Sequence, residues 1–325
     1  MPVLDAYWQT HNLISRTLRP LSRLFCLVVH IRRTGYRKGL FKTHTLSVPV
    51  VIVGNISVGG TGKTPLVIWL ANYWRNKGFR PGILTRGYLG KAASWPQIVT
   101  PHNSDPQQVG DEAVLLARRC QCPVAAGANR RESGQLLISK YACNLLISDD
   151  GLQHYALHRD LEIAVIDGQR RMGNGFCIPA GPLREPLSRL RTCDLIITNG
   201  QAATGEYSMS LYGEHAISLP DPNYKKPLTA FRQQKIVAIA GIGNPERFFT
   251  MLRNQGLTIE EHPFVDHHNF INSDLSGLKG QTILMTEKDA VKCERLRHIT
   301  NFWYIPVTAV PEPSFIDKLE HIHLY

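Results

Sequence analysis

Residues 50–65 constrain the fold of this 325-residue chain more than any other part of its sequence. Their β-branched beginning predicts a buried strand, and the glycine-rich stretch that follows leads through Gly-Lys-Thr into an apolar segment with helical spacing. Such an arrangement wraps backbone N–H groups around a polyphosphate, with Lys63 reaching the outer phosphates and Thr64 reaching Mg²⁺. Ser57 replaces the first glycine of the strict pattern, and some loops of this kind are only tight turns, but the flanking strand and helix favour nucleotide binding.

The residues expected to hold the nucleotide phosphates are the following: Asn55, Gly59, Gly60, Thr61, Gly62, Lys63 and Thr64.

Charge points to an anionic partner. The net charge is +11 at pH 7, which suits nucleic acid, an acidic membrane face or a phosphorylated substrate. Basic residues gather near the N-terminus: Arg16, Arg19, Arg23, Arg32, Arg33, Arg37, Lys38 and Lys42. This charge flanks an apolar run and no nucleic-acid-binding module is recognisable, so we expect no nucleic-acid partner. The sequence indicates no obligate protein partner.

The apolar run, residues 24–31, is far shorter than the roughly 20 residues that a membrane-spanning helix requires. It also lacks the cleavage site of a secretory signal. Two interpretations fit it equally: a basic amphipathic helix on an anionic bilayer, or a core helix with a solvated basic face. The seven cysteines are odd in number and form no C-x-x-C pair, which indicates reduced thiols in the cytosol.

Apolar runs recur along the chain and predict an α/β fold. The runs at 145–148, 163–166 and 195–198 are continuous rather than alternating, which is typical of parallel strands covered by helices on both faces. A second α/β pattern begins near residue 236. We expect four parts: an N-terminal amphipathic membrane-interface region (1–45), a P-loop NTPase-like parallel-sheet core (46–200), a β-hairpin linker (201–234) and a smaller C-terminal α/β domain (235–325).

Acidic pairs mark two further candidate positions. Asp149 and Asp150 end a predicted strand, where an aspartate of a phosphate-loop enzyme holds Mg²⁺. Asp111 and Glu112 begin a predicted helix, where acids also serve simply to cap the first turn.

Three loops carry other polar groups. Arg184 and Glu185 lie in a proline-bracketed loop, which is either a site or a structural turn. Arg86 follows a predicted strand at the ligand-binding edge of an open sheet. His267 follows Asp266 in a segment that, as an isolated motif, is more typical of a surface turn than of a site.

Together these motifs resemble the tetraacyldisaccharide 4′-kinase family of lipid A biosynthesis. The resemblance rests on eight segments in the family's order, at residues 54–65, 85–88, 110–112, 149–154, 182–186, 243–248, 266–267 and 286–289. It implies transfer of the γ-phosphate of ATP to the 4′-hydroxyl of a tetraacyldisaccharide 1-phosphate, which forms lipid IVA.

The family also implies roles for individual residues. Lys63 and Thr64 serve the phosphates and Mg²⁺, and Asp149, Asp150 and Glu185 organise the metal. Asp111 orients or accepts the hydroxyl proton with support from His267. The head group is expected to meet Arg86, Tyr88, Gln153, His154 and Arg184.

A four-chain lipid acceptor favours the membrane interpretation of the N-terminal segment, with the enzyme peripheral or monotopic on the cytoplasmic face of the bacterial inner membrane. Two alternatives remain. A membrane-associated P-loop ATPase switch has a lysine before the paired glycines, where this chain has Val58. A P-loop kinase of a soluble small molecule leaves the basic N-terminus unexplained.

Overall fold

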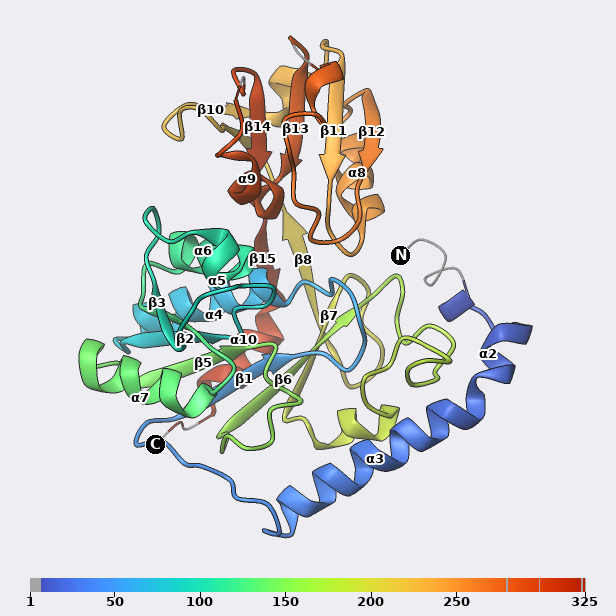
Figure 1. Cartoon of the computed structure of the whole chain (residues 1–325), viewed down its shortest axis with the longest axis vertical. Coiled ribbons are helices and arrows are strands. Elements are labelled where there is room, and N and C mark those ends of the chain that lie inside the picture. Colours follow the sequence, from blue (N-terminus) through green and yellow to red (C-terminus); the bar gives the residue numbers. More distant parts are fainter. Residues whose placement is uncertain (1–6, 279, 298, 323, 325) are drawn as a thin grey trace.

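The chain folds around two β-sheets, one above the other in Figure 1. The computed structural model describes residues 7–324 apart from 279, 298 and 323. Within these residues one sheet has nine strands and the other has six. The expected α/β fold is confirmed. Residues 1–6 of the expected N-terminal region lie outside the described residues.

The first sheet places the predicted phosphate-loop strand at its centre. In spatial order its strands are β15 (Thr308–Pro311), β8 (Tyr207–Tyr212), β7 (Leu195–Asn199), β6 (Leu161–Asp167), β1 (Val50–Gly54), β5 (Leu145–Asp149), β2 (Pro81–Thr85), β4 (Val124–Ala126) and β3 (Gln97–Val99). Neighbouring strands are parallel except at the two edges, where β15 and β3 run antiparallel to β8 and β4. β1 lies between two strands from later in the chain, so its carboxyl end faces a crevice of the kind where open α/β sheets bind ligands.

Helices cover both faces of this sheet, because alternate residues of β1 face opposite cores. Val51 and Val53 pack with α4 (Lys63–Asn76), α6 (Asp111–Cys120) and α10 (Pro313–Glu320). Val50 and Ile52 pack in the other core, which includes residues of α7 (Arg130–Tyr141) and α3 (Arg19–Arg37). The short helices α5 (Pro106–Val109) and η1 (Leu187–Thr192) complete the first domain.

The second sheet also has a core on each face. Its order is β10 (Lys225–Pro227), β9 (His215–Ser218), β14 (Phe302–Ile305), β13 (Thr282–Thr286), β11 (Ile236–Ala240) and β12 (Ile259–Pro263). One face packs with α8 (Pro245–Asn254) and η2 (Leu228–Phe231), and the other with α9 (Glu287–Cys293) and η3 (Ser276–Leu278).

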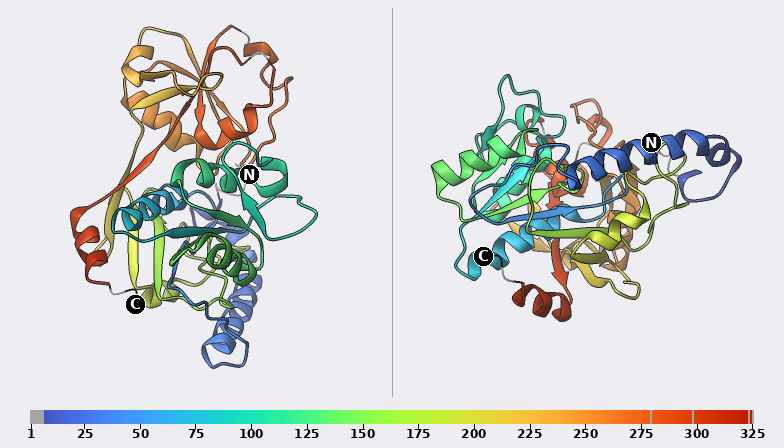
Figure 2. Two further views of the ribbon diagram at one scale, coloured as in Figure 1. Left: turned by 90° about the vertical axis from the view of Figure 1, so that its left-hand side faces the viewer. Right: turned by 90° about the horizontal axis from the view of Figure 1, so that it is seen from below.

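Two strands join the domains and place the boundaries differently from the expectation. The chain leaves the first sheet after β8 and returns to it as β15, which pairs with β8 and is followed by α10 (Figure 2). Residues 308–320 therefore pack with the first domain, although they were expected in the C-terminal domain 235–325. Residues 201–234, expected to form a separate linker, divide between the two sheets. Pairing between strands so distant in sequence leaves no local signal.

The N-terminal helices α2 (Leu13–Thr17) and α3 run along the outside of the first domain (Figures 1 and 2). One side of α3 contacts the body, where the hydroxyl of Ser22 donates to the carbonyl of Cys177 over 2.7 Å. The other side exposes a stripe of large apolar residues, each more than half exposed: Leu21, Leu24, Leu27, Val28 and Ile31. Among the helices in the described part of the chain, none combines the length and apolarity needed to cross a membrane.

Candidate active site

A cleft of about 1240 Å³ lies between the two domains. The first domain contributes the loop after β1 and residues at the ends of β2 and β5, and the second contributes residues 242–244, the start of α8 and residues 266–267 and 286–288. Residues far apart in sequence thus face one cleft at the carboxyl edge of the first sheet. This cleft is large enough for a nucleotide and part of a second substrate.

The phosphate loop has the geometry that the sequence predicts. α4 begins at Lys63 immediately after Gly62, whose φ of +98° favours glycine. The Lys63 Nζ lies 3.1 Å from Asn55 Oδ1 and 3.4 Å from Asp150 Oδ1, and Asn199 donates to the carbonyl of Thr61 over 3.3 Å. The loop is therefore braced at its start and end, with its lysine charge at the helix N-terminus, where anions bind.

Asp149 and Asp150 lie in the cleft but in different electrostatic environments. Burial, together with the negative charge of Glu112, raises the pKa of Asp149 to about 7, although the charge of Lys63 opposes this. Burial also raises the pKa of Asp150, but the charges of Lys63 and Arg184 outweigh it and hold this pKa at about 2.

The acidic pair fits a divalent cation. Asp149 Oδ1 is buried and has no hydrogen-bond partner among the described residues. The described residues contain no cluster of three or more side chains of histidine, cysteine, aspartate or glutamate with metal-ligand geometry. Mg²⁺ at such sites commonly takes one or two carboxylates and completes its shell with phosphates and water, so Asp149, Asp150 and Thr64 are an adequate set.

Glu185 has a different environment from the one expected of a metal ligand. Its side chain is 1% exposed, and its carboxylate accepts from Gln153 Nε2 over 2.8 Å and from the hydroxyl of Tyr155. The Nε of Arg189 lies 3.5 Å away. With these three partners, Glu185 holds the segment around Gln153 in place, and its expected role as a metal ligand stays a prediction.

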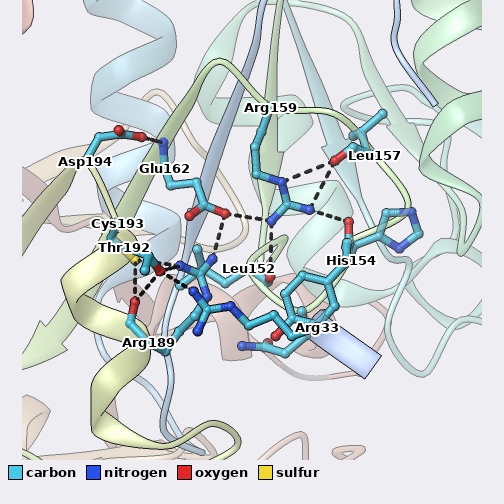
Figure 3. Close-up of polar contacts among 12 residues, drawn as sticks. Arg33, Leu152, His154, Leu157, Arg159, Glu162, Arg189, Thr192, Cys193 and Asp194 are labelled. Carbon is cyan, nitrogen blue, oxygen red and sulfur yellow. Dashed lines mark hydrogen bonds and ion pairs between the residues drawn. The ribbon is translucent and has the colours of Figure 1, made fainter. Parts of the chain in front are cut away.

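A buried ionic cluster anchors the segment that carries Gln153 and His154 (Figure 3). Arg159 donates to the carbonyls of Leu152 and His154, over 3.2 and 2.5 Å, and pairs with Glu162 over 2.7 Å. Arg189, with a side chain 2% exposed, approaches the same glutamate to 2.6 Å. The segment is thus tied to β6, and its two polar side chains line the cleft.

Asp111 meets the second domain directly. Its Oδ1 accepts from the backbone N–H of Glu112 over 2.9 Å, and its Oδ2 lies 3.2 Å from Nδ1 of His267. Burial raises the pKa of Asp111, but the hydrogen bond from His267 and the charge of Lys288 outweigh it and hold this pKa at about 2. The carboxylate is therefore ionised and directed toward the histidine.

Lys288 determines which nitrogen of His267 carries the proton. Its Nζ lies 3.1 Å from His267 Nε2, 3.0 Å from Glu112 Oε1 and 3.6 Å from Asp266 Oδ1. A protonated lysine only donates, so Nε2 accepts from it and the proton is on Nδ1, which donates to Asp111. Burial lowers the pKa of Lys288, but the surrounding carboxylates raise it above its ordinary value, so the lysine stays charged.

Further ionic contacts hold the domains together around the cleft. Arg170 donates to the carbonyl of Gly60 over 2.9 Å and to that of Gly243 over 3.3 Å, which links the phosphate loop to the second domain. Arg247 pairs with Asp167 over 2.5 Å.

The remaining expected residues, Arg86, Tyr88 and Arg184, all line the cleft. Arg86 is exposed just after β2, and the ring of Tyr88 lies 5.1 Å from that of His267. Arg184 donates to both carboxylate oxygens of Asp150, over 3.1 and 2.9 Å, and its expected contact with the head group stays a prediction.

Sequence reasoning missed several residues that line the cleft: Arg32, Arg130, Asn199, Arg247 and Lys288. For Lys288 there was a signal, because it follows a strand-ending threonine in one of the segments that resemble the kinase family. For Arg130, which donates to the carbonyl of Asp149 over 3.2 Å, nothing in the local sequence indicated a role.

Known proteins resemble the chain over nearly its whole length. The family model LpxK, tetraacyldisaccharide-1-P 4′-kinase, matches residues 14–323. A tetraacyldisaccharide 4′-kinase of Nitrosococcus oceani is 53% identical over 309 residues, covering 95% of this chain and 90% of the relative. One from Methylobacillus flagellatus is 47% identical over 318 residues, covering 97% and 94%.

A solved structure agrees with these matches. The crystal structure of LpxK from Aquifex aeolicus in complex with ATP is 30% identical and superposes with a TM-score of 0.79, covering 96% of this chain and 100% of that one. With a family model that matches most of the chain and relatives well above 30% identity, the chain belongs to the LpxK family of tetraacyldisaccharide-1-P 4′-kinases.

Proposed function

We propose that this chain transfers the γ-phosphoryl group of ATP to the 4′-hydroxyl of a tetraacyldisaccharide 1-phosphate, a step of lipid A biosynthesis that forms lipid IVA. One observation carries the proposal: His267 of the second domain lines the same cleft as the phosphate loop and bonds through Nδ1 to Asp111 of the first domain, next to Glu112 of the cleft wall. A carboxylate opposite a bound triphosphate can orient an acceptor hydroxyl for in-line attack.

The reaction divides between the two walls of the cleft. Lys63 and the N–H groups of residues 59–64 bind the β- and γ-phosphates of ATP. Thr64, Asp149 and Asp150 would hold Mg²⁺, which would neutralise the charge that develops on the phosphates. The 4′-oxygen forms its bond to Pγ as the bond from Pγ to the β,γ-bridging oxygen breaks, and ADP leaves.

Asp111 receives the hydroxyl proton in this scheme. Its pKa of about 2 makes it a weak base before the reaction, so its main contribution is to orient the hydroxyl. The proton transfers to it late, when the new P–O bond is largely formed. His267 holds the carboxylate through Nδ1–H, and the contact across the domains makes this arrangement depend on closure.

A radiolabelled assay tests the assignment. Wild type, Asp111→Ala and Glu246→Ala are incubated with [γ-³²P]ATP and the disaccharide 1-phosphate in detergent micelles. We expect wild type and Glu246→Ala, whose exposed side chain lies outside the acidic pair and its partners, to phosphorylate the lipid. Asp111→Ala should lose roughly 10²- to 10⁴-fold in kcat. ATP hydrolysis without lipid phosphorylation would support a switch ATPase, and phosphorylation of soluble sugars alone would support a soluble-substrate kinase.

We further propose that α3 places the enzyme on the cytoplasmic face of the inner membrane as a peripheral or monotopic protein. Its exposed apolar stripe and the basic residues beside it suit the interface of an anionic bilayer. Leu24→Asp/Val28→Asp should lose flotation with phosphatidylglycerol vesicles and keep its activity in micelles. Ile271→Asp, at a similarly exposed position in the second domain, serves as the control. Unchanged flotation of the double variant would contradict the proposal.

A further inference from the structure

Asp289 is a buried carboxylate that the proposed mechanism does not use. It lies on α9 directly after Lys288, and its side chain is 0% exposed. Its Oδ1 lies 2.8 Å from Nζ of Lys292, whose side chain is 8% exposed. Taking two charges out of water costs free energy, so the other partners of this carboxylate indicate what the buried pair holds in place.

Asp289 links its helix to the end of a neighbouring strand. α9 follows β13 and Gly241 follows β11, and these two strands are parallel neighbours. Asp289 Oδ2 accepts from the hydroxyl of Thr286, the residue that caps α9, over 2.6 Å. The same oxygen also accepts from the backbone N–H of Gly241 over 2.9 Å. In a capping box the acid bonds within its own helix end, so the bond to Gly241 does more than cap α9.

Gly241 in turn holds the main chain of His267. Its carbonyl accepts from the backbone N–H of His267 over 3.1 Å. His267 has a φ of +59°, a left-handed conformation that is uncommon outside glycine and persists where neighbouring groups enforce it. Two adjacent residues of α9 therefore act on His267: Lys288 contacts its ring, and Asp289 holds its main chain through Gly241.

We propose that Asp289 is a positioning residue for phosphoryl transfer, which acts through Gly241 to keep His267 beside Asp111. The proposal rests on the proposed kinase function and deepens it. The side chain of Asp289 does not line the cleft, so it acts on the reaction only through other residues. Nδ1 of His267 lies 3.2 Å from Asp111 Oδ2, and small displacements of such groups lower the rate steeply because the reacting atoms must be aligned.

A double-mutant cycle tests whether Asp289 acts through His267. kcat for the disaccharide 1-phosphate in detergent micelles and KM for ATP are measured for wild type, Asp289→Ala, His267→Ala and the double variant. Asp289→Asn removes the charge but keeps an oxygen that can accept from Gly241. Cys293→Ala is the control, because Cys293 is a buried residue of the same helix that packs in the core of the second domain and does not line the cleft.

We expect Asp289→Ala to lower kcat about tenfold, the effect of losing a hydrogen bond to a charged group, with KM for ATP unchanged. In the His267→Ala background the same change should cost less than about twofold, because the residue to be positioned is absent. Asp289→Asn should recover most of the lost kcat, and Cys293→Ala should match wild type.

A second variant perturbs the same contact without removing the carboxylate. In Gly241→Ala the new Cβ would lie 3.0 Å from Asp289 Oδ1, so the carboxylate must move away from this strand end. We expect a lower kcat that again disappears in the His267→Ala background. Thermal melting is recorded for every variant, and if Asp289→Ala does not fold, the cycle with Gly241→Ala decides the question.

Four results would overturn the inference. Equal losses in both backgrounds would make the role of Asp289 structural. Equal losses in Asp289→Asn and Asp289→Ala would attribute the effect to the charge beside Lys292. A higher KM for ATP at unchanged kcat would assign the contact to nucleotide binding. Unchanged kcat in Asp289→Ala would remove the positioning role and leave the kinase function intact, whereas absence of lipid phosphorylation by wild type would refute the kinase function itself.

Discussion

Replacing Lys288 by methionine removes a charge from the contact between the domains while keeping most of the side-chain volume. Lys288 belongs to α9 of the second domain and pairs with Glu112 of α6 in the first domain over 3.0 Å. It also donates to Nε2 of His267, whose Nδ1 bonds to Asp111. The variant leaves the carboxylates of Asp111, Glu112 and Asp266 facing one another without the cation between them.

The structure gives the size of the effect. Two unit charges 3.0 Å apart interact by about 5 kcal/mol in an effective dielectric of about 20. The lost hydration of both groups cancels much of this energy. The side chain of Lys288 is 15% exposed and that of Glu112 is 32% exposed, so we expect a net cost of about 2 kcal/mol. Because closure brings these groups together, the cost should lower kcat/KM for the acceptor about thirtyfold.

A double-mutant cycle provides the assay. kcat/KM is measured for wild type, Lys288→Met, Glu112→Gln and the double variant, together with Arg118→Met. Arg118 of α6 pairs over 2.8 Å with Glu294, which directly follows α9, but does not contact His267, so its loss should cost less than threefold. We expect the sum of the two single-variant losses in kcat/KM, expressed as free energies, to exceed the loss in the double variant by at least 1 kcal/mol. Additivity within about 0.5 kcal/mol would refute the coupling, and a thirtyfold loss in Arg118→Met would attribute the effect to the interface in general.

Three further variants test other contacts. In Gly243→Ala the new Cβ lies 2.8 Å from a backbone nitrogen of the phosphate loop, so we expect kcat/KM for ATP to fall about tenfold. Gly277→Ala is the control: its Cβ meets no atom within 4 Å, so its kcat/KM should match that of wild type. The hydrogen bond from Arg171 is the largest cause that lowers the pKa of Glu206 from 4.5 to about 2, so this stabilisation is present above pH 4.5 and is lost as the pH falls toward 2. The urea midpoints of wild type and Glu206→Gln should therefore converge over that range, and a constant difference would contradict the assignment. Glu185→Gln tests the metal role of Glu185 in a Mg²⁺ titration of activity. Because Gln153 and Tyr155 already donate to this carboxylate, we expect the variant to keep the Mg²⁺ dependence of wild type, and a raised Mg²⁺ requirement would identify Glu185 as a ligand.

Local sequence signals predicted the parts of the site that lie within one strand–loop–helix unit. The phosphate loop was predicted from residues 50–65, and Asp149 and Asp150 from the end of an apolar strand. The structure brings these two segments together because β1 and β5 are parallel neighbours and end at the same edge of the sheet, where their loops meet. The start of α6 at Asp111 was also visible in the sequence.

Contacts between distant segments escaped prediction. Nothing in the sequence near Glu185 indicated that Tyr155 and Gln153 donate to its carboxylate, so these contacts were not predicted. Likewise, the return of β15 to the first sheet depends on pairing with β8, about 100 residues earlier in the chain, and this moved the domain boundary.

The sequence by itself therefore determined the part of the site expected to bind the phosphate donor, ATP. Its strand, glycine-rich loop and helix are adjacent in the chain and take their geometry from local backbone preferences. The part of the site expected to meet the acceptor was decided by the tertiary structure. Only the packing of two domains brings Asp111, His267 and Lys288 to one point, and only the path of α3 carries Arg32 to the same cleft. Their chemistry depends on distances and burial, which are properties of the folded chain and not of any segment alone.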